Sequence, residues 1–243
     1  MKAMILAAGL GTRLRPLTET RPKALVEVGG RTLLEITLTR LRTFGVREVI
    51  INVHHFADMT VDYLQANGFF GMRIEVSREE VLLDTGGGLK KAASFFAQDD
   101  GSFILHNVDV LSSIDLRRML EFHIENQALA TLAVKDRKTS RYLLFNKHLQ
   151  LFGRRSGKGS GQEIVGSADQ SQALAFCGIH IISSRLIERM TEEGAFSIID
   201  CYLRLAARGE KIVAFRADEY YWRDLGRPND IVQAASDLKG PLL

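Results

Sequence analysis

Cysteine, proline and tryptophan are scarce in this sequence, which contains two, four and one of them among 243 residues. The two cysteines, Cys177 and Cys201, form no Cys-x-x-Cys pair, and both lie in apolar stretches. This pattern favours buried, reduced, structural thiols over a redox or metal-binding pair. Long hydrophobic runs are also lacking: the apolar run at 3–8 is too short for a signal peptide, and nothing is long enough to span a membrane. We therefore expect a cytoplasmic protein without a membrane partner.

Neither sign of charge is in large excess, and the formal net charge is +3. No run of lysine and arginine resembles a basic arm, which argues against nucleic acid as a partner. A mildly positive chain suits small anionic substrates. The hydrophobic share of 46% and the charged share of 25% are typical of a soluble globular protein. Because there is no internal repeat and no clear linker, we expect one domain over residues 1–243, as a monomer or homodimer.

Apolar segments of two kinds alternate along the first 135 residues. Short continuous runs, typical of strands buried on both faces, lie at 2–9, 48–53, 72–77, 102–107 and 128–134. Helices are predicted at 32–45, 57–67, 89–97 and 116–126, and Thr32 with Glu35 forms a capping box at the first of them. This alternation predicts an α/β fold with a Rossmann-like, mostly parallel sheet and helices on both faces.

The pattern changes after Lys135. Two short strands at 142–146 and 149–153 are joined by a turn near 147–148, which predicts a hairpin. Residues 153–172 are rich in glycine and serine and predict a mobile loop. The remaining predicted elements are a buried strand at 173–182, helices at 184–190 and 198–208, strands at 211–216 and 220–225, and a helix that begins at Pro228. The second half therefore predicts a small β-rich insertion.

The stretch that follows the first strand, "AAGLGTRLRPLTETRPK", combines glycines with positive charge. In open α/β sheets ligands bind beyond the carboxyl ends of the strands, and Gly9 and Gly11 let backbone N–H groups converge on an anion there. The dinucleotide fingerprint is missing because Leu14 stands where its third glycine belongs, and no Gly-Lys-Ser/Thr follows for a P-loop. We expect the loop to stay extended and to wrap a polyphosphate, with Arg13 and Lys23 at its two ends.

Over residues 6–30 the chain resembles the signature of the sugar-1-phosphate nucleotidyltransferases, G-x-G-T-R-L-x-P-x-T followed by P-K-x-L. "LLDTGGGLKKA" is similar to the family's base-contacting loop, and "FILHNVDVLSSIDL" and "YYWRDLGRPNDI" are similar to its two metal-binding segments. The likeness extends over the whole chain and is greatest to the family's compact bacterial branch. It implies that a nucleotidyl group passes from an NTP to a sugar 1-phosphate, with release of pyrophosphate. It also implies a nucleotide-binding half at 1–135, and a half with the sugar site and the second metal ligand at 136–243.

The resemblance also implies roles for single residues. Arg13 is expected to bind the leaving pyrophosphate, and Lys23 the α-phosphate and the sugar phosphate, as the two catalytic residues. Asp109 and Asp224 are expected to hold Mg²⁺, which prefers carboxylate and phosphate oxygens. The implied nucleotide site consists of Leu6, Ala7, Ala8, Gly9, Gly11, Thr12, Arg13, Asp84, Thr85, Gly86 and Gly87. The implied acceptor site consists of Lys23, Asn107, Leu143, Glu163, Phe176 and Gly178.

The nucleotide base is expected to be read by Asp84, whose carboxylate accepts a ring N–H of uracil or guanine but faces a lone pair on cytosine or adenine. The resemblance favours UTP. Three alternatives stay open: a GTP-dependent enzyme of the mannose-1-phosphate type, a relative that acts on a non-sugar phosphate such as phosphocholine, and a non-catalytic subunit that senses NDP-sugars. The last kind tends to lose the loop cations or the metal aspartates, which this chain keeps. A dinucleotide-dependent oxidoreductase is disfavoured by the missing fingerprint.

Three positions depart from the family pattern. Val108 stands where the first metal segment often has glycine, and Arg227 replaces a threonine after the second. Leu143 replaces the glycine of a Tyr-Gly pair that helps to hold the sugar. Because the phosphate and metal parts match the pattern, these departures bear mainly on which sugar is accepted.

Overall fold

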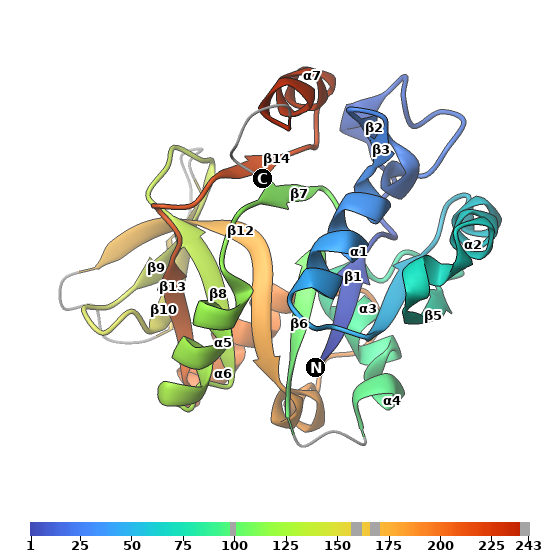
Figure 1. The fold of residues 1–243 in the computed structure, drawn as a ribbon. Coiled ribbons are helices and arrows are strands. Elements are labelled where there is room, and N and C mark those ends of the chain that lie inside the picture. Colours follow the sequence, from blue (N-terminus) through green and yellow to red (C-terminus); the bar gives the residue numbers. More distant parts are fainter. Residues whose placement is uncertain (98–100, 157–161, 166–170, 239–243) are drawn as a thin grey trace.

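The computed structural model describes residues 1–97, 101–156, 162–165 and 171–238 (Figure 1). Its centre is a ten-stranded mixed sheet in the order β11-β10-β9-β12-β6-β1-β4-β5, with β8 paired to both β12 and β13. Strands β6, β1, β4 and β5 run parallel. They span Ser102–Asn107, Lys2–Leu6, Glu48–Val53 and Arg73–Arg78. Their carboxyl ends therefore meet at one edge of the sheet.

Helices pack on both faces of this sheet because its central strands are apolar on both sides. In β1, Ala3 and Ile5 belong to one buried cluster, with α1, α2, α5 and α7, whereas Met4 belongs to a second, with α3, α4 and α6. The helices span Leu33–Thr43 (α1), Ala57–Ala66 (α2), Asp84–Lys91 (α3), Ala93–Phe96 (α4), Leu116–Glu125 (α5), Ile198–Ala207 (α6) and Pro228–Asp237 (α7). The predicted cap of α1 is confirmed, since Thr32 Oγ1 accepts a hydrogen bond from Glu35 N–H (3.0 Å). No helix in the described residues is long and apolar enough to cross a membrane.

The second half of the chain adds antiparallel strands to the sheet (Figure 1). Strand β12 is antiparallel to β6, β8 and β9, and so joins the parallel strands to a β-rich extension. The strands of this part span Ala130–Lys135 (β8), Arg141–Phe145 (β9), Leu151–Ser156 (β10), Gln162–Ile164 (β11), Gln172–Ser183 (β12) and Ile212–Arg216 (β13), of which β13 is parallel to β8. The predicted hairpin is confirmed as the antiparallel pair β9–β10. The predicted α/β fold with a small β-rich part is confirmed as well.

Two short strand pairs and several 3₁₀ turns complete the described chain. β7 pairs with β14, and β2 with β3, both antiparallel. These strands span Val110–Ser112, Trp222–Asp224, Glu27–Val28 and Arg31–Thr32. The 3₁₀ segments are Thr12–Leu14 (η1), Lys23–Leu25 (η2), Gly68–Gly71 (η3) and Ser184–Arg189 (η4). The β7–β14 pair matters most for function, because it brings the segment after β6 next to the C-terminal part of the chain.

Several segments differ from the sequence-based expectation. The helix expected at 89–97 begins earlier, at Asp84, and is divided into α3, which ends at Lys91, and α4, so the run of three glycines is helical. The helix expected at 184–190 is the 3₁₀ segment η4. Within the expected mobile loop at 153–172, the described residues form part of β10 and β11, and 157–161 and 166–170 lie outside the described residues. The loop expected to stay extended up to Lys23 folds into η1 and further turns. Packing against distant residues accounts for the helical glycines, whereas hydrogen bonds between residues three apart form the turns of the loop.

Candidate active site

A cavity of about 470 Å³, the first cavity, lies at the carboxyl ends of β1, β4 and β6. This is the edge at which open α/β sheets bind their ligands. It is lined by Leu6, Ala7, Ala8, Gly9, Lys23, Asn52, Glu79, Leu82, Asp84, Thr85, Asn107, Val108 and Asp109. Six residues of the predicted nucleotide site are among them. Lys23, Asn107 and Asp109, predicted for catalysis, acceptor binding and metal binding, line the same cavity.

A chain of buried hydrogen bonds joins four segments around the first cavity. Ala7 N–H donates to Asn52 Oδ1 (2.8 Å), and Asn52 Nδ2 donates to Glu79 Oε1 (2.7 Å). Leu83 N–H donates to the other carboxylate oxygen, Glu79 Oε2 (3.0 Å). Asn52 and Glu79 are only 3% and 4% exposed, so water does not compete for these bonds. Sequence reasoning misses both residues. The signal that could have found them is their position at the carboxyl end of β4 and directly after β5.

The start of α3 forms one wall of the first cavity. Asp84 is exposed and has a left-handed backbone (φ +58°), and its Oδ1 accepts a hydrogen bond from Thr85 N–H (2.6 Å). The next glycines face the protein: a Cβ at Gly86 would lie 2.3 Å from a ring carbon of Phe196, and one at Gly87 would lie 2.4 Å from a backbone oxygen. Close packing therefore overrides the low helix propensity of glycine. Asp84 and Thr85 line the cavity, whereas Gly86 and Gly87 do not line it and let α3 pack closely against the segment that contains Phe196.

The loop after β1 turns back on itself. Gly11 has a left-handed backbone (φ +63°), and its carbonyl accepts a hydrogen bond from Thr18 Oγ1 (2.8 Å). A Cβ at Gly11 would lie 2.9 Å from Thr18 Cγ2, so this turn requires glycine. Thr12 and Arg13 follow in η1. Arg13 lies beside Gly226, where a Cβ would be 2.7 Å from Arg13 Nη2. The loop thus brings the Arg13 guanidinium to the segment that follows β14.

Lys23, Asp109 and Asp224 meet where this loop, β7 and β14 come together. Lys23 Nζ forms an ion pair with Asp109 Oδ2, and both side chains are 14% exposed. The β7–β14 register places Asp224 across from the residue that follows Asp109. Burial and then the charge of Asp109 raise the pKa of Asp224, while Lys23 and Arg13 oppose this shift. The two carboxylates therefore lie close enough for the charge of Asp109 to disfavour the charged form of Asp224.

This carboxylate pair fits a divalent cation. A cation between Asp109 and Asp224 would offset the repulsion that contributes to the raised pKa of Asp224. The described residues contain no cluster of three or more His, Cys, Asp or Glu side chains placed to bind a metal ion by themselves. Two carboxylates, completed by phosphate oxygens and water, are the donor set that Mg²⁺ usually takes. The pair therefore suits a metal that binds together with substrate phosphates.

A second cavity, of about 620 Å³, is rich in cations. It is lined by Arg13, Arg137, Lys138, Thr139, Ser140, Trp222, Arg223, Asp224, Arg227 and Asp230. Asp109 lines the first cavity and Asp224 the second, so the carboxylate pair lies where the two cavities adjoin. Because Arg13 lines the second cavity, a row of phosphates can extend from the first cavity past the carboxylates to a guanidinium group.

The predicted acceptor residues are only partly brought together. Lys23 and Asn107 line the first cavity. Gly178 packs against Asn107, because a Cβ at Gly178 would lie 2.9 Å from Asn107 Nδ2. The carbonyl of Phe176, on the same strand β12, accepts a hydrogen bond from Arg137 Nη2 (2.9 Å). This part of β12 thus lies between the first cavity and one cation of the second.

Leu143 and Glu163 line neither cavity, as far as the described residues show. Leu143 is 6% exposed and belongs to the second hydrophobic cluster. Glu163, on the exposed strand β11, forms an ion pair with Arg154 (2.7 Å). Their part in acceptor binding stays a prediction.

Comparison with known proteins identifies the family. A family model for nucleotidyl transferases matches residues 2–145. The N-acetylmuramate alpha-1-phosphate uridylyltransferase of Caulobacter vibrioides is 34% identical over 248 residues, which cover 97% of this chain and 96% of that protein. This chain belongs to the nucleotidyl transferase family. The family membership expected from the motifs is therefore confirmed.

Further nucleotidyl transferases are similar in sequence or in fold. A mannose-1-phosphate guanyltransferase of Yarrowia lipolytica is 31% identical, and the match covers 96% of this chain but 62% of that protein. The crystal structure of HddC from Yersinia pseudotuberculosis complexed with GMP-PN has the same fold, with a TM-score of 0.77, 22% identity, and coverage of 98% and 99% of the two chains. The relatives thus include both a uridylyltransferase and a guanyltransferase.

Proposed function

We propose that this nucleotidyl transferase moves the uridylyl group of UTP onto a sugar 1-phosphate and releases pyrophosphate. The observation that carries the proposal is the meeting of Lys23, Asp109 and Asp224 where two cavities adjoin. Transfer between two anions depends chiefly on charge neutralisation and positioning, and a cation beside a metal-binding pair supplies both. UTP is favoured over GTP because the similar uridylyltransferase matches over nearly the whole length of both proteins.

In this reaction an oxygen of the acceptor phosphate attacks the α-phosphorus, and the bond from the α-phosphorus to the pyrophosphate oxygen breaks. A phosphate dianion is already a nucleophile, so the site needs no general base. Lys23, a compact charge, would hold the α-phosphate beside the acceptor phosphate, and Arg13 would bind the departing pyrophosphate through two parallel N–H donors. Asp109 and Asp224 would hold Mg²⁺, which would neutralise phosphate charge there.

The first cavity would hold the nucleoside, with its base near Asp84 and Thr85. An unpaired polar edge in a dry pocket costs about 1–3 kcal/mol, so a carboxylate acceptor favours a base that offers a ring N–H. UTP and GTP should therefore be used, and CTP and ATP poorly. Asp84→Asn should narrow the gap between UTP and CTP, because an amide both donates and accepts. If Asp84 serves only to close the start of α3 through Thr85 N–H, the ranking of the four nucleotides will not change.

Pyrophosphate release tests the proposal directly. Each of the four NTPs is combined, in the presence of Mg²⁺, with the 1-phosphates of glucose, N-acetylglucosamine, mannose and N-acetylmuramate, and with phosphocholine. We expect release to be fastest with UTP. A ranking led by GTP would support the guanylyl alternative, and release with phosphocholine but with no sugar phosphate would support a non-sugar acceptor. A protein that binds UDP-sugars but releases no pyrophosphate in any combination would be a sensing subunit, and the proposal would be wrong.

A further inference from the structure

The second cavity holds more positive charge than the proposed reaction uses. Of its cations, Arg223 is already neutralised by an ion pair with Asp237 (2.9 Å), and Arg13 is assigned to pyrophosphate. Three cations are left, Arg137, Lys138 and Arg227, and none of them has a carboxylate within ion-pair distance in the described part of the chain. The lining also includes the carboxylates of Asp224 and Asp230, but its cations outnumber them, and such a cavity attracts anions.

Arg137 is held in place before any ligand binds. Its guanidinium lies over the ring of Trp222, 4.1 Å from the centroid, and its Nη2 donates to Phe176 O (2.9 Å). Trp222 is fixed in turn, because its Nε1 donates to Cys177 O (2.8 Å). Arg137 Nε is buried and has no hydrogen-bond partner among the described residues. Because Arg137 lines the cavity and is already held in place, an anion that binds the guanidinium there costs little side-chain entropy.

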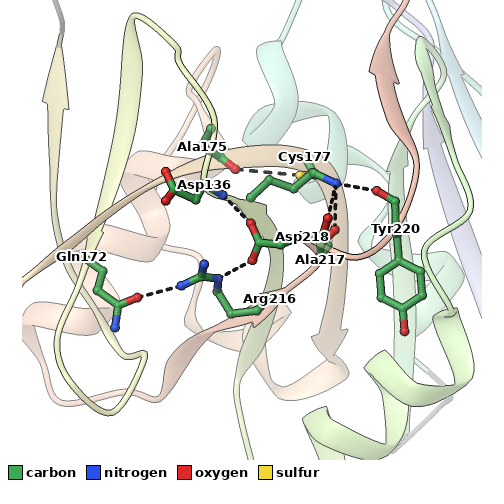
Figure 2. A network of polar contacts seen from close by, with 9 residues as sticks. Asp136, Gln172, Ala175, Cys177, Arg216, Ala217, Asp218 and Tyr220 are labelled. Carbon is green, nitrogen blue, oxygen red and sulfur yellow. Dashed lines mark hydrogen bonds and ion pairs between the residues drawn. The ribbon is translucent and has the colours of Figure 1, made fainter.

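The residues directly before Arg137 are also held by hydrogen bonds, and Figure 2 shows those of Asp136 with Asp218 and Arg216. Asp136 N–H donates to Asp218 Oδ1 (2.7 Å), and the other oxygen of Asp218 accepts from Arg216 Nε (2.6 Å). At the end of β8, Lys135 Nζ donates to three backbone carbonyls, at 217, 218 and 220. Lys135 therefore stabilises the local structure, whereas Arg137 and Lys138, which follow it in the chain, line the second cavity.

The position of these cations points to the acceptor rather than to the nucleotide. The partner of Arg137, Phe176, lies on β12 two residues before Gly178, which packs against Asn107 in the first cavity. Asp224 borders the same second cavity. An acceptor whose 1-phosphate lies at the carboxylate pair would thus extend along β12 toward Arg137 and Lys138.

We propose that the acceptor is a sugar 1-phosphate with a second negatively charged group, and that Arg137 and Lys138 bind that group. This inference rests on the proposed function, because it assigns a substrate class to the same site. This second group is a carboxylate or a second phosphate on the sugar, and it takes no part in the transfer reaction. Both groups match the two-point geometry of a guanidinium.

Matched acceptor pairs test the proposal and separate the two anions. N-acetylmuramate 1-phosphate differs from N-acetylglucosamine 1-phosphate by an ether-linked carboxylate, and glucose 1,6-bisphosphate differs from glucose 1-phosphate by a phosphate. We expect kcat/KM with UTP to be about 10-fold or more higher for the charged member of at least one pair. A preference confined to the first pair assigns a carboxylate, and one confined to the second assigns a phosphate.

Lys138→Gln shows whether the preference comes from this cavity. The ratio of kcat/KM between charged and neutral acceptors should fall about 10-fold in Lys138→Gln, and Arg137→Gln should lower it at least as much. Lys147→Gln, the same change on an exposed turn of the same half, should keep the ratio of the wild type. An equal loss with charged and neutral acceptors in Lys138→Gln would place Lys138 on the nucleotide phosphates and overturn the proposal.

The same assay separates failure of this inference from failure of the proposed function. Equal use of charged and neutral acceptors by the wild type would contradict the second anion site while leaving nucleotidyl transfer in place. Absence of pyrophosphate release with all four acceptors and every NTP would contradict the proposed function itself.

Discussion

Replacing Glu79 by glutamine turns one oxygen of a buried carboxylate into an amide NH₂ group, which cannot accept the hydrogen bond that this oxygen receives. Both oxygens of Glu79 receive a donor, from Asn52 Nδ2 (2.7 Å) and from Leu83 N–H (3.0 Å). A glutamine offers one acceptor only, so one of these donors must face an NH₂ group. Turning the Asn52 amide does not help, because its Nδ2 would then face Ala7 N–H, which now donates to Oδ1. One unsatisfied donor remains in every arrangement.

The cost of Glu79→Gln follows from burial. Glu79 is 4% exposed and Asn52 is 3% exposed, so water cannot replace the missing acceptor. A buried polar group left without a partner costs about 1–3 kcal/mol, and we expect the free energy of unfolding to fall by about that amount. Because Ala7 and Leu83 flank the first cavity, KM for the nucleotide should rise as well. Urea denaturation at pH 7 measures the first effect, and initial rates against nucleotide concentration measure the second.

Glu80→Gln is the matched control, since it removes the same charge from the adjacent, exposed residue. Its urea midpoint and its KM should equal those of the wild type. If Glu79→Gln is as stable as Glu80→Gln, the chain of hydrogen bonds does not hold the cavity together and the reasoning is refuted.

Three further changes probe the charged groups. Asp224→Asn should abolish pyrophosphate release, yet raise the free energy of unfolding without Mg²⁺. Because the fold raises the pKa of Asp224, this gain in stability is full above the raised pKa and vanishes below pH 3.8, the ordinary pKa of the group. A stability lower than that of the wild type in EDTA at pH 7 would contradict this prediction. Lys23→Ala should lower kcat about 100-fold or more and Arg21→Ala much less, whereas equal losses would mean that bulk charge matters rather than geometry. Burial lowers the pKa of His180 to about 3, so the contribution of the neutral ring to stability is full above about pH 6.5 and is lost as the pH falls from there toward 3. His180→Gln should therefore reduce the loss of stability at acid pH in urea denaturation, while the exposed His148→Gln should match the wild type.

Sequence reasoning worked best where function depends on spacing along one segment or on the end of a strand. Asp109 follows β6 at the carboxyl edge of the parallel strands, as expected, but Asp224 ends β14, which lies outside the main sheet and pairs antiparallel with β7. The structure brings them together through the β7–β14 pair. The left-handed backbone of Gly11 agrees with the conformational freedom expected of it, whereas its close approach to Thr18 is seen only in the structure. The motif spacing and the alternation of strands and helices could thus be predicted, but the pairing that joins the two aspartates could not.

Contacts between distant segments explain what the sequence could not supply. The glycine run after Asp84 indicates a loop by propensity, but the structure makes it helical because Phe196 packs where a side chain would lie. Asn52 and Glu79 look like ordinary polar residues until β4, β5 and α3 are placed side by side. The basic second cavity likewise needs the end of β8, β14 and the start of α7 in one place.

The most direct test of the central claim is pyrophosphate release from UTP and a sugar 1-phosphate as Mg²⁺ is titrated, for the wild type and Asp109→Asn. Circular dichroism shows first that the variant is folded. We expect release by the wild type to saturate with Mg²⁺, with a UDP-sugar as the second product in mass spectra. In Asp109→Asn the rate should fall about 100-fold or more, because the pair that neutralises the phosphates is lost. A folded Asp109→Asn protein that releases pyrophosphate at the wild-type rate and with the same Mg²⁺ dependence would contradict the account.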